Sequence, residues 1–175
     1  VGTVENKIND KSLEATHTTP DAISLQRLFR EMVDEGCKFC FIEASSHAID
    51  QNRLSGTKLA GAVFTNITHD HLDYHLTFDN YISAKKKLFD NLPSNAFALT
   101  NSDDTHAEDV VADCKARVIT FGVNSFADEK TRIVENGLQG LHLHINGSDL
   151  YSRLVGNFNA SNLTAVFCVA KALGF

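Results

Sequence analysis

The chain has 175 residues, 43% of them hydrophobic and 22% charged, which is the composition of a folded globular domain with a sizeable core rather than of a disordered or fibrous chain. The formal net charge of −6, without a long basic run, argues against a general nucleic-acid binder. No apolar stretch approaches the roughly 20 residues that span a bilayer, and no signal-peptide pattern opens the chain. Because the chain starts at Val1 and its only methionine is Met32, we expect it to be a fragment of a longer protein.

The first predicted element is a helix over residues 19–36. Thr19 is the expected N-terminal cap, Pro20 suits the first helical position and Gly36 suits the C-terminal stop. Apolar residues at helical spacing predict its buried face, which consists of Leu25, Leu28, Phe29 and Met32.

Short apolar runs and helical patterns alternate after this helix. The runs predict buried strands at residues 38–44, 59–65, 96–100 and 117–123. The helical patterns cover residues 78–91, with Thr77 as cap, and residues 105–113. Near-continuous apolar strands that alternate with helices predict an α/β fold, in which helices cover both faces of a mostly parallel sheet.

The pattern changes after Gly122. Short runs at residues 132–134, 138–145 and 152–155 are separated by Asn-Gly pairs and predict a small antiparallel hairpin region. Residues 159–173 are apolar nearly all round, which predicts a buried helix.

Polar residues follow three of the predicted strands. Glu43 ends the first strand and leads into Ser45, Ser46 and His47, residues 65–75 follow the second strand, and residues 101–104 follow the third. Ligands of open parallel sheets bind beyond the carboxyl ends of the strands. Three polar strand ends therefore favour a functional site over separate solvent-exposed loops.

The second of these loops holds the densest group of potential metal ligands, His69, Asp70, His71, Asp73 and His75. One interpretation is a binuclear zinc hydrolase of the metallo-β-lactamase kind, although Tyr74 stands where its H-x-H-x-D-H motif needs the last histidine. A second is a magnesium-phosphate site that uses one histidine beside carboxylates. In a structural alternative, the aspartates cap the following turn and the histidines are solvated.

Lys85 is expected on the inward face of the helix over residues 78–91. The apolar positions three, four or seven residues away from it are Phe78, Tyr81, Ile82, Leu88 and Phe89. Lys86 and Lys87 point away from that face and are expected to be solvated. An inward lysine either extends its charged head to the rim or, when desolvated, acts as a base, forms a Schiff base or adds carbon dioxide to become a carbamate. The pattern leaves these alternatives open.

Hydroxyl and guanidinium groups provide candidate anion-binding positions. Thr18 and Thr19 could hold an anion at the helix N-terminus, although capping by Thr19 explains them equally well. Arg53, close to Gln51, could clamp a phosphate or carboxylate, whereas a lone surface arginine is usually only solvated. None of the ten glycines fits the G-x-x-x-x-G-K-[ST] pattern of a nucleotide P-loop.

The four cysteines do not predict a disulfide framework. Cys37-x-x-Cys40 is compatible with half a zinc site or with a redox pair, but the chain has no second pair at this spacing. Buried, reduced thiols are the favoured interpretation.

Several motifs follow one another in a fixed order. They are Thr-Thr-Pro, Glu-Ala-Ser-Ser-His-Ala-Ile-Asp-Gln-Asn-Arg, Phe-Thr-Asn-Ile-Thr-His-Asp-His-Leu-Asp-Tyr-His, Tyr-Ile-Ser-Ala-Lys, Thr-Asn-Ser-Asp-Asp and Gly-Asn-Phe-Asn-Ala-Ser-Asn. Together they resemble the central domain of the Mur ligases, which is P-loop-NTPase-like, and within that family the MurE type, the UDP-N-acetylmuramoyl-tripeptide synthetases. The resemblance covers nearly the whole chain.

The resemblance implies ATP-dependent amide bond formation in peptidoglycan synthesis, in the cytoplasm. ATP would phosphorylate the D-Glu γ-carboxylate of UDP-MurNAc-L-Ala-D-Glu, and the amine of a diamino acid would attack the acyl phosphate. The implied diamino acid is meso-diaminopimelate in preference to L-lysine. The implied cofactor is Mg²⁺, and ATP is the co-substrate.

The resemblance also implies roles for individual residues. The magnesium ligands and catalytic residues would be Glu43, His71 and Lys85, the last as a carbamate. The positions that hold the UDP-MurNAc-dipeptide are matched by Thr18, Thr19, Ser45, Gln51 and Arg53. Asn159 and Asn162 match asparagines near the adenine of ATP, Asn66 is assigned to the same cofactor site, and His47 matches a recurrent site position.

The family's P-loop is expected upstream of Val1, and its amino-acid-selecting domain is expected beyond Phe175. Residues 1–175 would then be a central domain truncated at its N-terminal side, inactive in isolation and without nucleic-acid or membrane partners. The alternatives are another Mur or folylpolyglutamate-type ligase, a zinc hydrolase and a non-catalytic anion-binding module. The Thr-Thr-Pro and Ser-Ser-His…Gln-x-Arg segments favour the MurE type.

Overall fold

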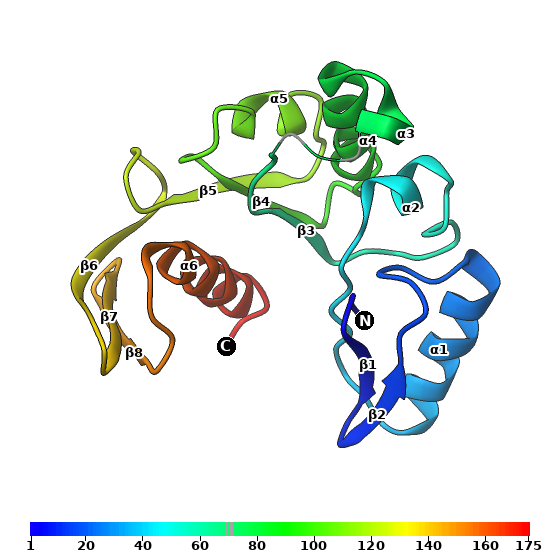
Figure 1. The fold of residues 1–175 in the computed structure, drawn as a ribbon, viewed down its shortest axis with the longest axis horizontal. Coiled ribbons are helices and arrows are strands. Elements are labelled where there is room, and N and C mark those ends of the chain that lie inside the picture. Colours follow the sequence, from blue (N-terminus) through cyan, green and yellow to red (C-terminus); the bar gives the residue numbers. More distant parts are fainter. Residues whose placement is uncertain (69, 71) are drawn as a thin grey trace. The chain divides into compact units, whose positions relative to one another are not determined.

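The computed structural model describes residues 1–68, 70 and 72–175 and divides into two compact units, Val1–Lys58 and Leu59–Phe175 (Figure 1). The first unit consists of β1 (Glu5–Ile8), β2 (Lys11–Glu14), α1 (Ala22–Asp34) and α2 (Ser46–Asp50). β1 and β2 form an antiparallel hairpin that has no counterpart among the predicted elements. Ile8, Leu28 and Met32 form the core of this unit.

Helix α1 occupies most of the first predicted helix, but its N-terminal cap is Asp21. The Asp21 Oδ1 atom accepts hydrogen bonds from the backbone N–H groups of Ile23 and Ser24, both at 3.0 Å. The prediction of Thr19 as the cap and Pro20 as the first helical residue is therefore wrong. A carboxylate closer to the helix satisfies the N–H groups that Thr19 was expected to satisfy.

The buried face and the C-terminal end of α1 agree with the sequence. Leu25, Leu28 and Met32 are buried, and Phe29 packs against the same core. Gly36 has a φ of +76°, which glycine adopts without strain and which ends the helix.

Residues 38–44 do not form the predicted buried strand. They form no strand, and the residues Phe39 and Phe41 are 48% and 65% exposed. The Val1 amine donates to the Phe41 carbonyl at 2.8 Å, and the Glu43 N–H donates to the Val1 carbonyl at 2.9 Å. These two bonds join the segment to Val1, and no strand ladder forms along it among the described residues.

The second unit contains a six-stranded sheet. Its strands, in spatial order, are β3 (Gly61–Phe64), β4 (Phe97–Asn101), β5 (Arg117–Gly122), β6 (Glu129–Gly137), β7 (Gly140–Ile145) and β8 (Ser148–Ser152). Pairing is parallel from β3 to β6 and antiparallel from β6 to β8. The predicted α/β fold, with a mostly parallel sheet and a small antiparallel hairpin region, is confirmed.

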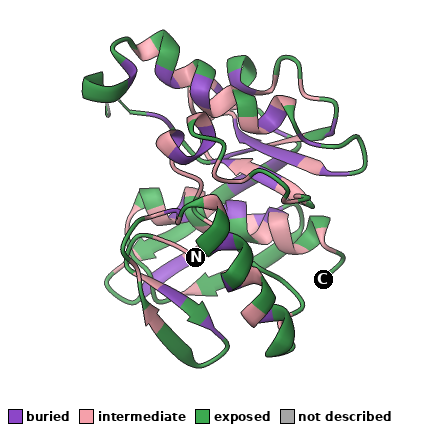
Figure 2. Ribbon diagram, turned by 90° about the vertical axis from the view of Figure 1, so that its right-hand side faces the viewer, coloured by how far each residue is buried: buried purple, intermediate pink, exposed green. Residues whose placement is uncertain are grey.

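Helices cover both faces of this sheet. They are α4 (Phe78–Asp90), α5 (Ala107–Val111) and α6 (Asn157–Ala172), while α3 (Leu72–His75) packs against α4. α4 and α5 lie on one face, where Phe64 and Val110 are buried, and α6 lies on the other, against Leu99 and Phe121 (Figure 1). Buried positions run along the strands of the sheet (Figure 2). Thr77 caps α4 as predicted, because its Oγ1 accepts the Asn80 N–H at 3.2 Å.

Helix α6 is less buried than its composition predicts. Ala160, Thr164 and Cys168 are buried, but Phe158 and Val166 are 70% and 65% exposed. One side of the helix therefore meets the sheet while the other does not. None of the helices in the described part of the chain is both long and apolar enough to cross a membrane.

Candidate active site

Thr19 is the most deeply buried of the predicted binding residues in the first unit, with 1% of its surface exposed. Its hydroxyl donates to the backbone oxygen of Glu43 at 2.6 Å and accepts from the backbone N–H of Ser45 at 3.1 Å. Because Asp21 caps α1, the Thr19 hydroxyl is available for these two bonds. It thereby fixes the backbone on both sides of Ala44, where Glu43 and Ser45 present their side chains.

Arg53 is anchored against the same segment. Its guanidinium donates to the Thr19 carbonyl at 2.7 Å, and to the Gln51 Oε1 atom through Nε at 3.0 Å and through a terminal nitrogen at 2.7 Å. Three of the five guanidinium N–H groups are thus used within the described residues, and two remain for a ligand. Such an oriented guanidinium is suited to a carboxylate or phosphate.

Ser45 begins the short helix that follows Glu43. Its hydroxyl accepts the Ala48 N–H at 3.2 Å, which makes Ser45 the N-terminal cap of α2 and places His47 in the first turn. The structure therefore brings together the predicted precursor-binding residues of this unit around one extended segment and one helix start. These residues are Thr18, Thr19, Ser45, Gln51 and Arg53.

The Glu43 carboxylate is exposed and is held by Thr3. Glu43 Oε2 accepts the Thr3 hydroxyl at 2.8 Å and the Thr3 backbone N–H at 3.2 Å. Thr3 Oγ1 also lies 3.0 Å from Thr18 Oγ1. Glu43 Oε1 accepts no hydrogen bond from the residues that the structure describes.

Lys85, in the second unit, lies on the inward face of α4 as predicted. Its Nζ atom is 5.2 Å from the centre of the Tyr81 ring, which is a cation–π distance. Burial raises the pKa of the Tyr81 hydroxyl, and the nearby negative charge of Asp70 raises it further. Asp70 comes from the loop after β3, so this loop and the Lys85 amine approach the same aromatic ring.

Lys86 is not the solvated lysine that its spacing predicts. Its side chain is 22% exposed, and its Nζ atom binds Asp90 at 2.7 Å and Asp113 at 2.6 Å. Hydrogen bonds to Asp113 and Asp90 raise the pKa of Lys86. Lys86 therefore links α4 to the segment after α5, while Lys87 is exposed as predicted.

The histidine-rich loop is described only in part. His69 and His71, which include one predicted magnesium ligand, lie outside the described residues. His75 is buried, with 6% of its surface exposed, and its ring is stacked on Tyr81 at 5.2 Å between centres. Burial among these aromatic rings contradicts the structural alternative in which His75 is solvated.

Asn101, at the end of β4, connects the segments that carry the three asparagines assigned to ATP. Its Nδ2 atom donates to the Thr65 carbonyl at 2.8 Å, beside Asn66, and to Ser161 Oγ at 3.3 Å, between Asn159 and Asn162. Asn66 and Asn162 are exposed, whereas Asn159 is half-buried and donates to the Val155 carbonyl at 2.8 Å. The structure thus brings the loop after β3 and the start of α6 to one buried residue.

The two aspartates after β4 serve the scaffold. Asp103 accepts the backbone N–H groups of Val123, Asn124 and Ser125 at 2.6–3.1 Å, and Asp104 accepts the Ile67 N–H at 2.9 Å. Burial raises the pKa of Asp103, but the bonds from these three N–H groups outweigh it and lower the pKa overall. Both carboxylates hold neighbouring loops in place.

The donor chemistry of the unit fits a hard cation at Glu43. Oε2 of Glu43 is held by Thr3, and Oε1 accepts no hydrogen bond from the described residues. A carboxylate oxygen of this kind is a ligand that Mg²⁺ prefers. No group of three or more His, Cys, Asp or Glu side chains that could hold a metal ion is found among residues 1–68, 70 and 72–175. Glu43 belongs to the first unit and Lys85 to the second.

All four cysteines are free thiols. Cys168 is buried, and burial, with the charge of Glu129 as a smaller cause, raises its pKa to about 12. Cys40 is exposed, so the expectation of buried thiols is wrong there, because residues 38–44 do not enter a sheet.

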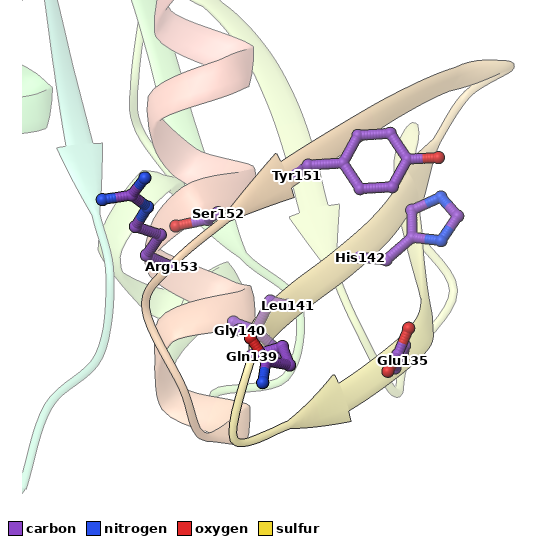
Figure 3. Close-up of a pocket in the computed structure, with 8 residues that line it drawn as sticks. All are labelled: Glu135, Gln139, Gly140, Leu141, His142, Tyr151, Ser152 and Arg153. Atoms are coloured by element: carbon purple, nitrogen blue, oxygen red, sulfur yellow. The ribbon is translucent and has the colours of Figure 1, made fainter.

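A separate open pocket of about 380 Å³ lies over the antiparallel strands of the second unit (Figure 3). Figure 3 shows His142 of β7 beside Tyr151 of β8, and their rings are stacked with centres 4.2 Å apart. His142 Nε2 also donates a hydrogen bond to Asp149 Oδ1 at 2.8 Å. The pocket contains none of the predicted site residues.

Thr3 and Asn101 are the two positioning residues that the motifs do not assign. A polar residue at the carboxyl end of a parallel strand is a signal for Asn101. No local signal identifies Thr3, because its contacts with Glu43 and Thr18 join positions 40 and 15 residues apart in the chain.

Comparison with known proteins matches the chain to the Mur ligase middle domain over residues 1–170. The chain is 51% identical over 174 residues to the UDP-N-acetylmuramoyl-L-alanyl-D-glutamate–2,6-diaminopimelate ligase of Cytophaga hutchinsonii, and 49% identical to that of Bacteroides thetaiotaomicron. Each alignment covers 99% of this chain and 36% of the relative. The chain therefore spans about a third of the length of these relatives.

Solved structures agree. A UDP-N-acetylmuramoyl-L-alanyl-D-glutamate–2,6-diaminopimelate ligase superposes with a TM-score of 0.87 at 32% identity, over 100% of this chain and 37% of that one. MurF from Acinetobacter baumannii gives a TM-score of 0.58 at 23% identity over 67% of this chain and 27% of that one, a likeness of fold alone.

Proposed function

Because this chain belongs to the Mur ligase middle-domain family, we propose that it is the central part of an ATP-dependent ligase that adds 2,6-diaminopimelate to UDP-MurNAc-L-Ala-D-Glu. The observation that carries the proposal is the 51% identity with a ligase of that name over nearly the whole chain. The arrangement of Thr19, Glu43 and Arg53 in one hydrogen-bonded group supports it. The reaction would take place in the cytoplasm, where ATP is supplied.

The precursor would bind along the segment that Thr19 holds. Arg53 keeps two N–H groups for an anion, and Gln51 fixes the plane of the guanidinium. Thr18 and Ser45 offer hydroxyl groups beside it. This combination suits a carboxylated dipeptide, because a rigid cation and short hydroxyl groups can orient a carboxylate that must react at one oxygen.

Glu43, His71 and Lys85 would hold magnesium, which would neutralise the negative charge of the ATP phosphates during phosphoryl transfer. An amine is a poor ligand for this hard cation. Lys85 would take part after its neutral amine adds carbon dioxide, which forms a nitrogen–carbon bond, releases a proton and leaves a carbamate with two oxygen atoms. The inward position of Lys85 on α4 supports this role, because it brings the amine to the Tyr81 ring, which Asp70 of the loop after β3 also approaches.

The nucleotide would lie where Asn101 ties the loop after β3 to the start of α6. Asn66, Asn159 and Asn162 flank the two segments that Asn101 joins. Amide side chains both donate and accept hydrogen bonds, as recognition of an adenine edge requires.

The proposal is tested on the complete protein in which this chain lies. Phosphate release should require ATP, UDP-MurNAc-L-Ala-D-Glu and the diamino acid together, and Lys85→Ala should abolish it. Short-chain carboxylic acids should restore part of the activity of Lys85→Ala, because they can supply the missing carboxylate. Full activity of Lys85→Ala without such an addition would exclude the carbamate role.

Lys87→Ala is the matched control. Lys87 lies on the same helix, two positions away, and is exposed. Its replacement removes one positive charge from α4 and should leave phosphate release unchanged.

A further inference from the structure

Thr3 contacts the two parts of the first unit that have different proposed roles. Its hydroxyl and its backbone N–H both donate to Oε2 of Glu43, at 2.8 and 3.2 Å. The same hydroxyl oxygen lies 3.0 Å from the hydroxyl of Thr18. One exposed threonine therefore joins the carboxylate proposed for the metal to a hydroxyl proposed for the precursor.

The direction of these hydrogen bonds follows from counting protons. An ionised carboxylate only accepts, so Thr3 gives its single hydroxyl proton to Glu43. The Thr3 oxygen must then accept from Thr18, which gives a chain that runs from Thr18 through Thr3 to Glu43. The Thr18 oxygen keeps its lone pairs for a donor on the ligand, such as a peptide N–H.

The two bonds from Thr3 restrict how the Glu43 side chain can turn. A glutamate has three rotatable bonds and, if unpaired, exchanges among many rotamers on an exposed surface. Here two donors converge on one oxygen, and a Cβ built on Gly2 would lie 3.4 Å from that oxygen, so the carboxylate rests against the Gly2–Thr3 backbone. Oε1 is left as the oxygen that can reach a cation.

We propose that Thr3 is a positioning residue for this site, which holds the Glu43 carboxylate in the orientation that binds the divalent cation and couples it to Thr18. The proposal rests on the proposed role of Glu43 as a magnesium ligand. Residues that hydrogen-bond a metal ligand commonly contribute to metal affinity without touching the metal. Thr3 would do so through its hydroxyl, because its backbone N–H is present whatever the side chain.

The test is a titration of the complete protein with Mn²⁺ alone, in which electron paramagnetic resonance measures the free ion. Thr3→Val removes the hydroxyl with little change in shape, and we expect it to raise the dissociation constant for Mn²⁺ about tenfold. Thr3→Ser keeps the hydroxyl and should stay within about twofold of the wild type. Thr16→Val, at an exposed threonine of the same unit, is the matched control and should leave the constant unchanged.

Glu43→Gln distinguishes the positioning role of Thr3 from the metal-binding role of Glu43 on which it rests. If Glu43→Gln weakens Mn²⁺ binding and Thr3→Val does not, the positioning role of Thr3 is wrong while the metal role of Glu43 stands. If Glu43→Gln leaves Mn²⁺ binding unchanged, the proposed metal role itself is wrong. Should Thr3→Val fail to fold, as judged by circular dichroism, the comparison of Thr3→Ser with Thr3→Ala decides in the same way, and equal affinities of these two variants overturn the proposal.

Discussion

The hydroxyl of Thr19 donates to the carbonyl of Glu43 at 2.6 Å, and this bond holds the segment on which the candidate site is built. Thr19→Val keeps the shape of the side chain but leaves the partly buried Glu43 carbonyl and Ser45 N–H without this partner. We expect a loss of about 1–3 kcal/mol in the free energy of unfolding, measured by urea titration. Thr105→Val, at an exposed threonine, should change it by less than about 0.5 kcal/mol. An equal effect of both variants would contradict the role of Thr19.

Arg53 should act on precursor binding rather than on the chemical step. Arg53→Lys keeps the charge but cannot reproduce the planar bonds to Thr19 and Gln51. We expect KM for UDP-MurNAc-L-Ala-D-Glu to rise roughly tenfold or more, as for loss of a well-oriented charged contact, with a smaller change in kcat. Arg30→Lys, at an exposed arginine of α1, is the control. An unchanged KM in Arg53→Lys would rule out a clamp.

Glu129 and Lys171 form an ion pair between β6 and α6. The Glu129 side chain is 11% exposed and accepts from Lys171 Nζ at 2.7 Å and from Asn146 Nδ2 at 2.8 Å. Lys171→Met should lower the free energy of unfolding by about 1–3 kcal/mol, because it leaves a nearly buried carboxylate without its cation. Glu129→Gln should cost less, because a neutral amide needs no cation, and Lys115→Met is the exposed control. The prediction fails if Glu129→Gln destabilises more than Lys171→Met.

Asp103 should make the stability of the second unit depend on pH. Hydrogen bonds from Ser125, Val123 and Asn124 outweigh burial and hold the pKa of Asp103 below its usual value. A carboxyl whose pKa is lower in the folded state stabilises the fold above its unfolded pKa, about 4, and this contribution is lost as the pH falls through the folded pKa. The difference in unfolding free energy between the wild type and Asp103→Asn should therefore be largest near neutral pH and shrink below about pH 4.

Glu135→Gln is the control for this pH series. Glu135 is exposed on β6 and accepts no hydrogen bond among the described residues, so the variant tests the loss of a charge alone. If the difference in unfolding free energy between the wild type and Asp103→Asn stays constant from neutral to acid pH, the lowered pKa of Asp103 is not the cause of the pH dependence.

The parts of the fold that could be predicted are those that depend on residues close to one another in the sequence. The cap Thr77, the stop Gly36 and the apolar stripe of α1 each depend on residues within a few positions of one another. The alternation of apolar runs and helical patterns, and the short runs after Gly122, are local patterns too, and they correctly predicted the parallel sheet and its antiparallel end.

The sequence predictions fail where two residues suit the same role and where a contact joins residues far apart in the chain. Asp21 and Thr19 both suit a helix cap, and the sequence does not say which side chain will face the first turn. Residues 38–44 are as apolar as a buried strand, but burial depends on what lies beside them. Thr3 contacts Glu43 beside the pairing of Val1 with the Phe41–Glu43 backbone, and both contacts join residues about 40 positions apart, so no local pattern predicts them.

The measurement that tests the central claim most directly is mass spectrometry of the product formed by the complete protein from ATP, UDP-MurNAc-L-Ala-D-Glu and meso-diaminopimelate. The account predicts UDP-MurNAc-tripeptide, with one ADP and one phosphate released for each amide bond, and no product when any of the three substrates is left out. Hydrolysis of ATP or of the precursor without formation of the amide would contradict it.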